Sequence, residues 1–223
     1  MPRSRDSRPR LAILGSGRGS NAVSLMTAFR RGELAAELAL VVCNVAGAPL
    51  IDRAHEHGYP VICLPHLGLS REAHEAQLSA LLTAHRIEHL LLAGYMRLLS
   101  PTFLRRFPGH ILNIHPSLLP AFPGLAAVAA QWQAGVETAG ATVHFVDEGV
   151  DTGPILLAQS ITVRGDEGAA GLAERIRLEV ELELYPRAVR LFLARLAQGL
   201  PQPAVPSAAD PSAPHVSPLL GDR

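Results

Sequence analysis

Two polar side chains, Asn113 and His115, stand near the end of an apolar run, at a spacing that lets them act on one substrate. They lie in HILNIHPSLLP, residues 110–120, where Pro116 ends the run and Pro120 stiffens the segment after it. Residues two apart on a strand project from the same face. A histidine at a strand end is, by itself, more often packed or solvated than functional. An amide donor beside an imidazole, however, can stabilise an oxyanion and move a proton, so we predict that both residues are catalytic.

A second candidate lies in the acid-rich turn TVHFVDEGVDTGP, residues 142–154, which holds three acids and two glycines. Any one of these acids is by default a solvated turn residue. A carboxylate placed next to His115 would favour the imidazolium and orient the ring. Composition alone does not show that one of these acids meets His115.

The glycine-rich turn at residues 15–21, GSGRGSN, follows an expected strand and opens an expected helix. Glycines allow a close backbone approach to a ligand, and a helix N-terminus suits a phosphate. The pattern is weak, because such turns also serve packing alone. A dinucleotide site would need an acid at the end of the second strand, but that strand ends Cys43-Asn44-Val45. We therefore predict the phosphate of a smaller ligand.

Short apolar strands alternating with helices must position these residues, which indicates an α/β fold with a mostly parallel sheet. Later in the chain two β-branched runs lack a long helix between them, which predicts an antiparallel edge. The expected strands are 11–14, 39–43, 61–64, 89–93, 111–114, 141–146 and 155–163, and the expected helices are 20–30, 50–57, 70–85 and 169–196.

The composition of the chain excludes several classes of function. The chain of 223 residues is 48% apolar and 18% charged, which excludes disorder over most of its length. Its formal net charge of zero gives no electrostatic reason for binding nucleic acid or an anionic membrane. All 20 basic residues are arginines, which excludes a Schiff-base lysine and a Walker-type phosphate loop. We expect Cys43 and Cys63, each in an apolar run, to be buried reduced thiols.

The sequence predicts one domain with a tail at each end. We expect an N-terminal arm at 1–9, a catalytic domain at 10–200 and a disordered tail at 201–223, because the last segment is rich in proline and alanine. The charged start is followed by only four apolar residues before Gly15, too few for a signal peptide. No window approaches the roughly 20 apolar residues of a membrane span. We therefore expect a cytoplasmic protein.

These segments, in this order, resemble the formyltransferase family that uses 10-formyltetrahydrofolate. The similarity runs from about Arg10 to Gly199, and a downstream DTGPI after LNIHPSLLP is highly specific for it. The resemblance implies a single Rossmann-like domain with helices on both faces of the sheet. The matching segments are SGRGSN (16–21), LSREAH (69–74), LAGYMRLLSP (92–101), LNIHPSLLPAFPG (112–124), TVHFVDEGVDTGPI (142–155) and Tyr185-Pro186.

The resemblance also implies a reaction and a site. The branch favoured by SGRGSN and AGYMRLLSP passes the formyl group of 10-formyltetrahydrofolate to the amine of glycinamide ribonucleotide in purine synthesis. Asn113 and His115 would bind the formyl oxygen, and Asp151 would favour a protonated His115. The implied substrate-binding residues are Gly17, Arg18, Gly19, Ser20, Asn21 and Glu181. The implied folate-binding residues are Arg71, Met96, Arg97, Leu98, Leu99, Asn113, Asp147, Glu148, Gly149, Val150 and Asp151.

The resemblance implies small-molecule substrates, no metal, no nucleic acid, no membrane, and a monomer or homodimer. The chain departs from the family pattern on the acceptor side, where Ala126, Val128, Ala139 and Leu182 stand in place of common histidines. Acceptor identity therefore stays open. The alternatives are a deformylase, transfer to another amine, and a binding protein without activity. A transfer-RNA formyltransferase would need an added RNA-binding domain, and a dehydrogenase would need the missing strand-end acid.

Overall fold

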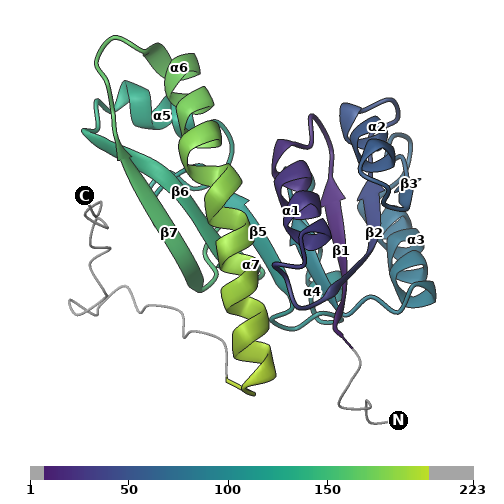
Figure 1. The fold of residues 1–223 in the computed structure, drawn as a ribbon. Coiled ribbons are helices and arrows are strands. Elements are labelled where there is room, and N and C mark those ends of the chain that lie inside the picture. Colours follow the sequence, from purple (N-terminus) through teal and green to yellow (C-terminus); the bar gives the residue numbers. More distant parts are fainter. Residues whose placement is uncertain (1–7, 201–223) are drawn as a thin grey trace.

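The computed structural model describes residues 8–200, which form one seven-stranded sheet in the order β3-β2-β1-β4-β5-β6-β7 (Figure 1). Strands β1 to β5 are parallel, whereas β6 pairs antiparallel with β5 and β7 antiparallel with β6. The predicted α/β class and antiparallel edge are therefore confirmed. The strands are β1 (Arg10–Gly15), β2 (Glu37–Cys43), β3 (Val61–Cys63), β4 (His89–Leu92), β5 (Ile111–His115), β6 (Thr138–Phe145) and β7 (Ile155–Thr162).

Helices cover both faces of this sheet. One core cluster joins the sheet to α1, α2 and the C-terminal helices, and a second joins it to α3 and α4. The central strands are apolar on both faces for this reason, as parallel strands between two helical layers must be. The helices are α1 (Ser20–Arg30), α2 (Pro49–Glu56), α3 (Arg71–Ala84), α4 (Pro101–Leu104), α5 (Ala127–Gln133), α6 (Gly168–Arg175), the π-helix η1 (Ile176–Glu181) and α7 (Leu182–Ala197).

The predicted single helix 169–196 is corrected by the structure, which divides it into α6, η1 and α7, seen in Figure 1 as one long path across the sheet. Pro186 lies inside α7 and has no N–H to offer the carbonyl of Leu182. That carbonyl accepts the Ser24 hydroxyl of α1 instead. The π-helical segment ends at Glu181, whose carboxylate accepts a hydrogen bond from Asn21 at 2.8 Å. Such bulges are frequent at functional sites.

The other elements agree with their predictions to within a few residues. The predicted helix start at Ser70 is confirmed, because the Ser70 side chain accepts the N–H of Ala73 at 3.1 Å. The sequence does not predict the short helices α4 and α5, because at four and seven residues they carry too little periodicity.

The prediction of two buried thiols is half wrong. Cys43 is buried in the core, and burial raises its pKa, but Cys63 on the edge strand β3 is exposed, and both are free thiols. Edge strand β3 has a single neighbour, so its side chains are covered less completely. The predicted disordered tail 201–223 and most of the N-terminal arm lie outside the described residues. Within residues 8–200, no helix combines the length and apolar character that crossing a membrane requires.

Candidate active site

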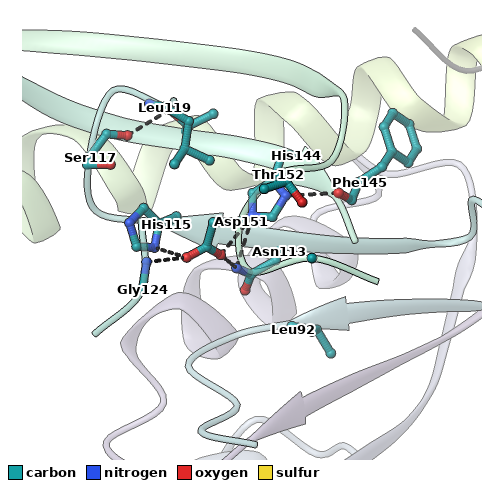
Figure 2. Close-up of polar contacts among 12 residues, drawn as sticks. Leu92, Asn113, His115, Ser117, Leu119, Gly124, His144, Phe145, Asp151 and Thr152 are labelled. Carbon is teal, nitrogen blue, oxygen red and sulfur yellow. Dashed lines mark hydrogen bonds and ion pairs between the residues drawn. The ribbon is translucent and has the colours of Figure 1, made fainter. Parts of the chain in front are cut away.

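Asp151 stands at the centre of a polar cluster that joins β5, β6 and the turn between β6 and β7 (Figure 2). Its Oδ2 lies 3.2 Å from Nδ1 of His115 and accepts the N–H of Gly124 at 2.8 Å. Its Oδ1 lies 3.3 Å from Nε2 of His144 and 3.4 Å from Nδ2 of Asn113. The structure therefore brings together the three side chains predicted to be catalytic, two from β5 and one from a distant turn.

The surroundings of Asp151 keep its carboxyl group ionised. Burial by itself would raise the pKa of this carboxyl. Hydrogen bonding with His144 and with the Gly124 N–H, together with positive charge on the two histidines, lowers the pKa to about 2. Asp151 is consequently a fixed negative charge at neutral pH, suited to orienting an imidazole and unsuited to donating a proton.

The ring of His115 is held at both nitrogens. Nδ1 faces the Asp151 carboxylate, and Nε2 lies 2.8 Å from the backbone oxygen of Phe122. Both oxygens are acceptors, so the two contacts are satisfied together when both ring nitrogens carry hydrogen. In this arrangement neither N–H is directed at an open position. For His115 to bind a formyl oxygen directly, its Nε2 has to leave the Phe122 carbonyl when substrate arrives.

The segment after β5 supplies two backbone groups to the site, the carbonyl of Phe122 and the N–H of Gly124. The hydroxyl of Ser117 bonds to the carbonyl of Ala121 at 2.6 Å, and the hydroxyl of Thr142 joins β6 to the carbonyl of Ser117 at 2.7 Å. Phe122 and Asp151 both have positive φ, at 54° and 53°. Non-glycine residues seldom adopt this conformation, and such strained positions cluster at functional sites.

The glycine-rich turn connects β1 to α1, an 11-residue helix with Gly19 at its N-cap. The backbone of Gly19 has φ 76°, and its missing side chain leaves room for Leu50, whose backbone amide donates to the carbonyl of Gly17 at 3.1 Å. The turn is held from the other side by Ser16, whose hydroxyl accepts the N–H of Met96 at 2.8 Å. The predicted phosphate turn and the predicted folate loop are therefore physically joined.

We predict that Gly19→Ala destabilises the protein and disturbs the turn, whereas Gly17→Ala leaves stability nearly unchanged. A Cβ at Gly19 would lie 2.8 Å from the Leu50 side chain and 3.2 Å from its Cα, at a positive φ, whereas a Cβ at Gly17 meets nothing within 4 Å. The left-handed conformation alone costs alanine about 1–2 kcal/mol. Urea unfolding of the two variants checks this expectation; equal stabilities would contradict it.

Glu181 lies at the end of η1, beside the predicted phosphate turn. Burial raises the pKa of this carboxyl, opposed by the hydrogen bond from Asn21 and the positive charge of Arg177. Asn21 Oδ1 is buried without a hydrogen-bond partner among the described residues. A half-buried acid above its usual pKa is destabilising when ionised, and perturbed groups of this kind cluster at functional sites.

We predict that Glu181→Gln raises the stability of the protein at neutral pH and weakens binding of the ribonucleotide that the resemblance implies. A raised folded-state pKa means that the wild type loses stability as pH rises through this pKa, so the advantage of the amide variant grows from pH 5 to pH 8. We expect the Tm of the amide variant to exceed that of the wild type by more at neutral pH than at acid pH. KM for the ribonucleotide should rise about tenfold or more. An advantage that is constant with pH would contradict the assignment.

The predicted folate-binding residues are spread over three surface elements. Met96 and Leu98 have exposed fractions of 68% and 62%, and Val150 of 45%, which is unusual for large apolar side chains. Arg71 begins α3 and lies 3.7 Å from Glu72. Asp147 is engaged within its own turn by Gly149 and Thr152. The exposed apolar groups are available for an aromatic ligand, and α3 is tied to the end of the 96–99 loop because Glu75 accepts the N–H of Ser100 at 2.7 Å.

Sequence reasoning missed His144. This residue is only 2% exposed, and it contacts both Asn113 and Asp151. The available signal was a histidine among β-branched and aromatic residues in the strand segment TVHFV, where a buried imidazole needs hydrogen-bond partners. The backbone groups of Phe122 and Gly124 were missed as well, since backbone contacts leave no mark on residue type. In residues 8–200, no three or more His, Cys, Asp or Glu side chains are grouped to hold a metal ion.

Comparison with known proteins agrees with the fold. Residues 9–189 match the formyl transferase family. The phosphoribosylglycinamide formyltransferase of Bacillus subtilis is 39% identical over 185 residues, which cover 82% of this chain and 94% of that protein. The structure of glycinamide ribonucleotide transformylase 1 from Geobacillus kaustophilus matches with a TM-score of 0.80 and 43% identity over 83% of this chain and 99% of that one.

A formyltetrahydrofolate deformylase from Pseudomonas syringae is also similar in structure, with a TM-score of 0.79 over 85% of this chain and 63% of that chain, but only 27% of the residues are identical. The family match and the curated relative both span most of the chain. The protein belongs to the formyl transferase family.

Proposed function

We propose that the protein transfers the formyl group of 10-formyltetrahydrofolate to the amine of glycinamide ribonucleotide, a step of purine synthesis. The observation that carries this proposal is the cluster of Asn113, His115 and Asp151 at the carboxyl end of β5. Ligands of open α/β sheets bind outside the carboxyl ends of the strands. The similarity to transformylases at 39–43% identity supports the choice of acceptor.

The reaction follows from the charges that must form. The amine nitrogen attacks the formyl carbon, and its electron pair passes to the formyl oxygen, giving a tetrahedral oxyanion. Asn113 donates a hydrogen bond to this oxygen, and a protonated His115 supplies positive charge beside it. The oxyanion then collapses, the bond to N10 of the folate breaks, and the amine loses the proton that N10 gains. Since Asp151 stays ionised, its part is to hold His115 protonated and oriented.

The phosphate of the ribonucleotide is proposed to lie on the turn from Gly17 to Asn21, at the N-terminus of α1, with Glu181 on its ribose. The acceptor would then lie at the carboxyl end of β1, next to the folate loop, because Ser16 joins the turn to Met96. Two positions where this chain lacks a histidine common in the family, Ala139 and Leu182, differ in their surroundings. Ala139 packs in the core, whereas Leu182 lines an open groove of about 580 Å³ together with Ser20 and Ser24.

The test is an absorbance assay of folate deformylation with the purified protein, 10-formyl-5,8-dideazafolate as donor, and glycinamide ribonucleotide as acceptor. Turnover that needs the ribonucleotide supports the proposal. Equal turnover without any amine favours the second candidate, hydrolysis by a deformylase, which the structural similarity to that enzyme class keeps in consideration. Folate binding without turnover in either assay would indicate a binding protein without catalytic activity.

The proposal also covers the location, the partners and the oligomeric state of the protein. We propose that it works in the cytoplasm on small molecules, as a monomer or homodimer, without a metal and without nucleic acid. Size-exclusion chromatography with and without ribonucleotide tests the oligomeric state.

A further inference from the structure

Ser16 lies between the two proposed substrate sites and has been assigned to neither. It follows β1 and comes directly before the proposed phosphate turn, Gly17 to Asn21. Its backbone N–H donates to the carbonyl of Gly94 at 3.0 Å, and its hydroxyl accepts the N–H of Met96 at 2.8 Å. One serine therefore joins the start of the folate loop, residues 96–99, to the start of the phosphate turn.

The folate loop is fixed at its far end and held by little before it. Leu99 packs against the second core cluster, and directly after the loop Glu75 of α3 accepts hydrogen bonds from the N–H of Ser100, at 2.7 Å, and from its hydroxyl. Within residues 8–200, the hydrogen bond to Ser16 is the one that the loop itself makes. The Ser16 hydroxyl is therefore the polar contact that sets the course of the exposed part of the loop.

On its other side Ser16 leads into the phosphate turn, which a bound ligand would order. The space beside Gly17 is open, since a Cβ at this position would meet nothing within 4 Å. A phosphate held by the N–H groups of the turn would fix the backbone of the turn, and with it the position of Ser16. When one ligand has ordered a segment, a second ligand that needs the same order binds at a lower entropic cost. The turn and the loop are joined in the way that such coupling requires.

We propose that Ser16 is a positioning residue that couples the two substrate sites. Ribonucleotide bound at the phosphate turn holds the Ser16 hydroxyl against the N–H of Met96, which orders the folate loop and raises its affinity for the folate. By thermodynamic linkage, bound folate raises the affinity for the ribonucleotide by the same factor. This inference rests on the proposed function, because it concerns the two ligands of that reaction.

The first experiment is a fluorescence titration with 5,8-dideazafolate, which has no formyl group to transfer, with and without saturating glycinamide ribonucleotide. We expect the ribonucleotide to lower the dissociation constant of the folate about twofold to tenfold in the wild type, the range that one hydrogen bond supplies. In Ser16→Ala the ratio of the two constants should fall to about one. Ser16→Thr keeps the hydroxyl and should restore most of the ratio.

A matched control separates this coupling from the general loss of a hydroxyl group. Thr83→Ala removes a hydroxyl that donates to the carbonyl of Ser79 at 2.8 Å, at the far end of α3, and should keep the wild-type ratio. A wild-type ratio in Ser16→Ala would overturn the proposal, even if that variant bound both ligands less tightly. So would a wild-type protein in which the folate constant does not depend on the ribonucleotide. Inorganic phosphate that binds without changing the folate constant would overturn the role given to the turn.

Amide hydrogen exchange at Met96, followed by NMR, tests the contact without turnover. The Met96 side chain is 68% exposed, so protection of its N–H depends on the bond to Ser16. We expect the ribonucleotide to slow this exchange in the wild type and to leave it unchanged in Ser16→Ala. If formyl transfer fails while the ribonucleotide still slows the exchange and raises folate affinity, the proposed function fails and the coupling stands. Formyl transfer with independent binding of the two ligands would overturn the coupling alone.

Discussion

Asp151→Asn is expected to lower kcat by about 10²–10⁴ while leaving the affinity for the folate nearly intact. The substitution keeps the shape of the side chain and removes its charge. In the wild type this charge faces Nδ1 of His115 at 3.2 Å, and its pKa of about 2 keeps it present at every pH of interest. Without it the imidazolium beside the oxyanion loses its counter-charge. Steady-state kinetics in glycinamide ribonucleotide, with folate affinity from fluorescence titration, measures both quantities.

The same substitution also changes how stability depends on pH. A folded-state pKa below the unfolded value means that the Asp151 carboxylate stabilises the fold above about pH 4, and that this contribution is lost as pH falls toward 2. Asp151→Asn should therefore be less stable than wild type at pH 6, by about 2 kcal/mol, and the difference should shrink at acid pH. Asp166→Asn, at an exposed acid, is the control and should show neither effect. Wild-type turnover in Asp151→Asn would remove Asp151 from the mechanism.

Asn113→Ala is expected to lower kcat by about 10²–10³, the usual cost of losing one oxyanion donor. Both ring nitrogens of His115 already face acceptors, Asp151 and the Phe122 carbonyl. Asn113 therefore supplies the N–H that remains free to bind the oxyanion. Since the interaction forms in the transition state, KM for the folate should change little.

The outcome for Asn113→Ala also decides how His115 acts. A loss below about tenfold would mean that His115 releases the Phe122 carbonyl and binds the oxyanion itself. A loss of similar size in both Asn113→Ala and His115→Ala, without a further loss in the double variant, would show the two acting as one unit. Pre-steady-state kinetics separates the chemical step from product release in each case.

The sequence by itself determined the seven strands and the longer helices before residue 169, and it placed Asn113 and His115 on one strand. Continuous apolar runs between helices predicted the parallel sheet, Ser70 marked the start of α3, and the spacing of Asn113 and His115 placed them together. Each of these features depends on neighbours a few residues away, and residue type records such local preferences directly. The phosphate turn was predicted for the same reason, since glycine at a positive φ is a local requirement.

Only the tertiary structure decided which acid and which histidine complete the site. Asp151 is one of three acids in its turn, and its contacts to Asn113 and Gly124 span 38 and 27 residues, while Asn21 meets Glu181 across 160. His144 was present in the sequence as one more strand residue until the pairing of β5 with β6 set it against Asn113. Strand register, loop path and the π-helical segment before α7 arise from packing between distant segments. No local pattern of residue types carries that information.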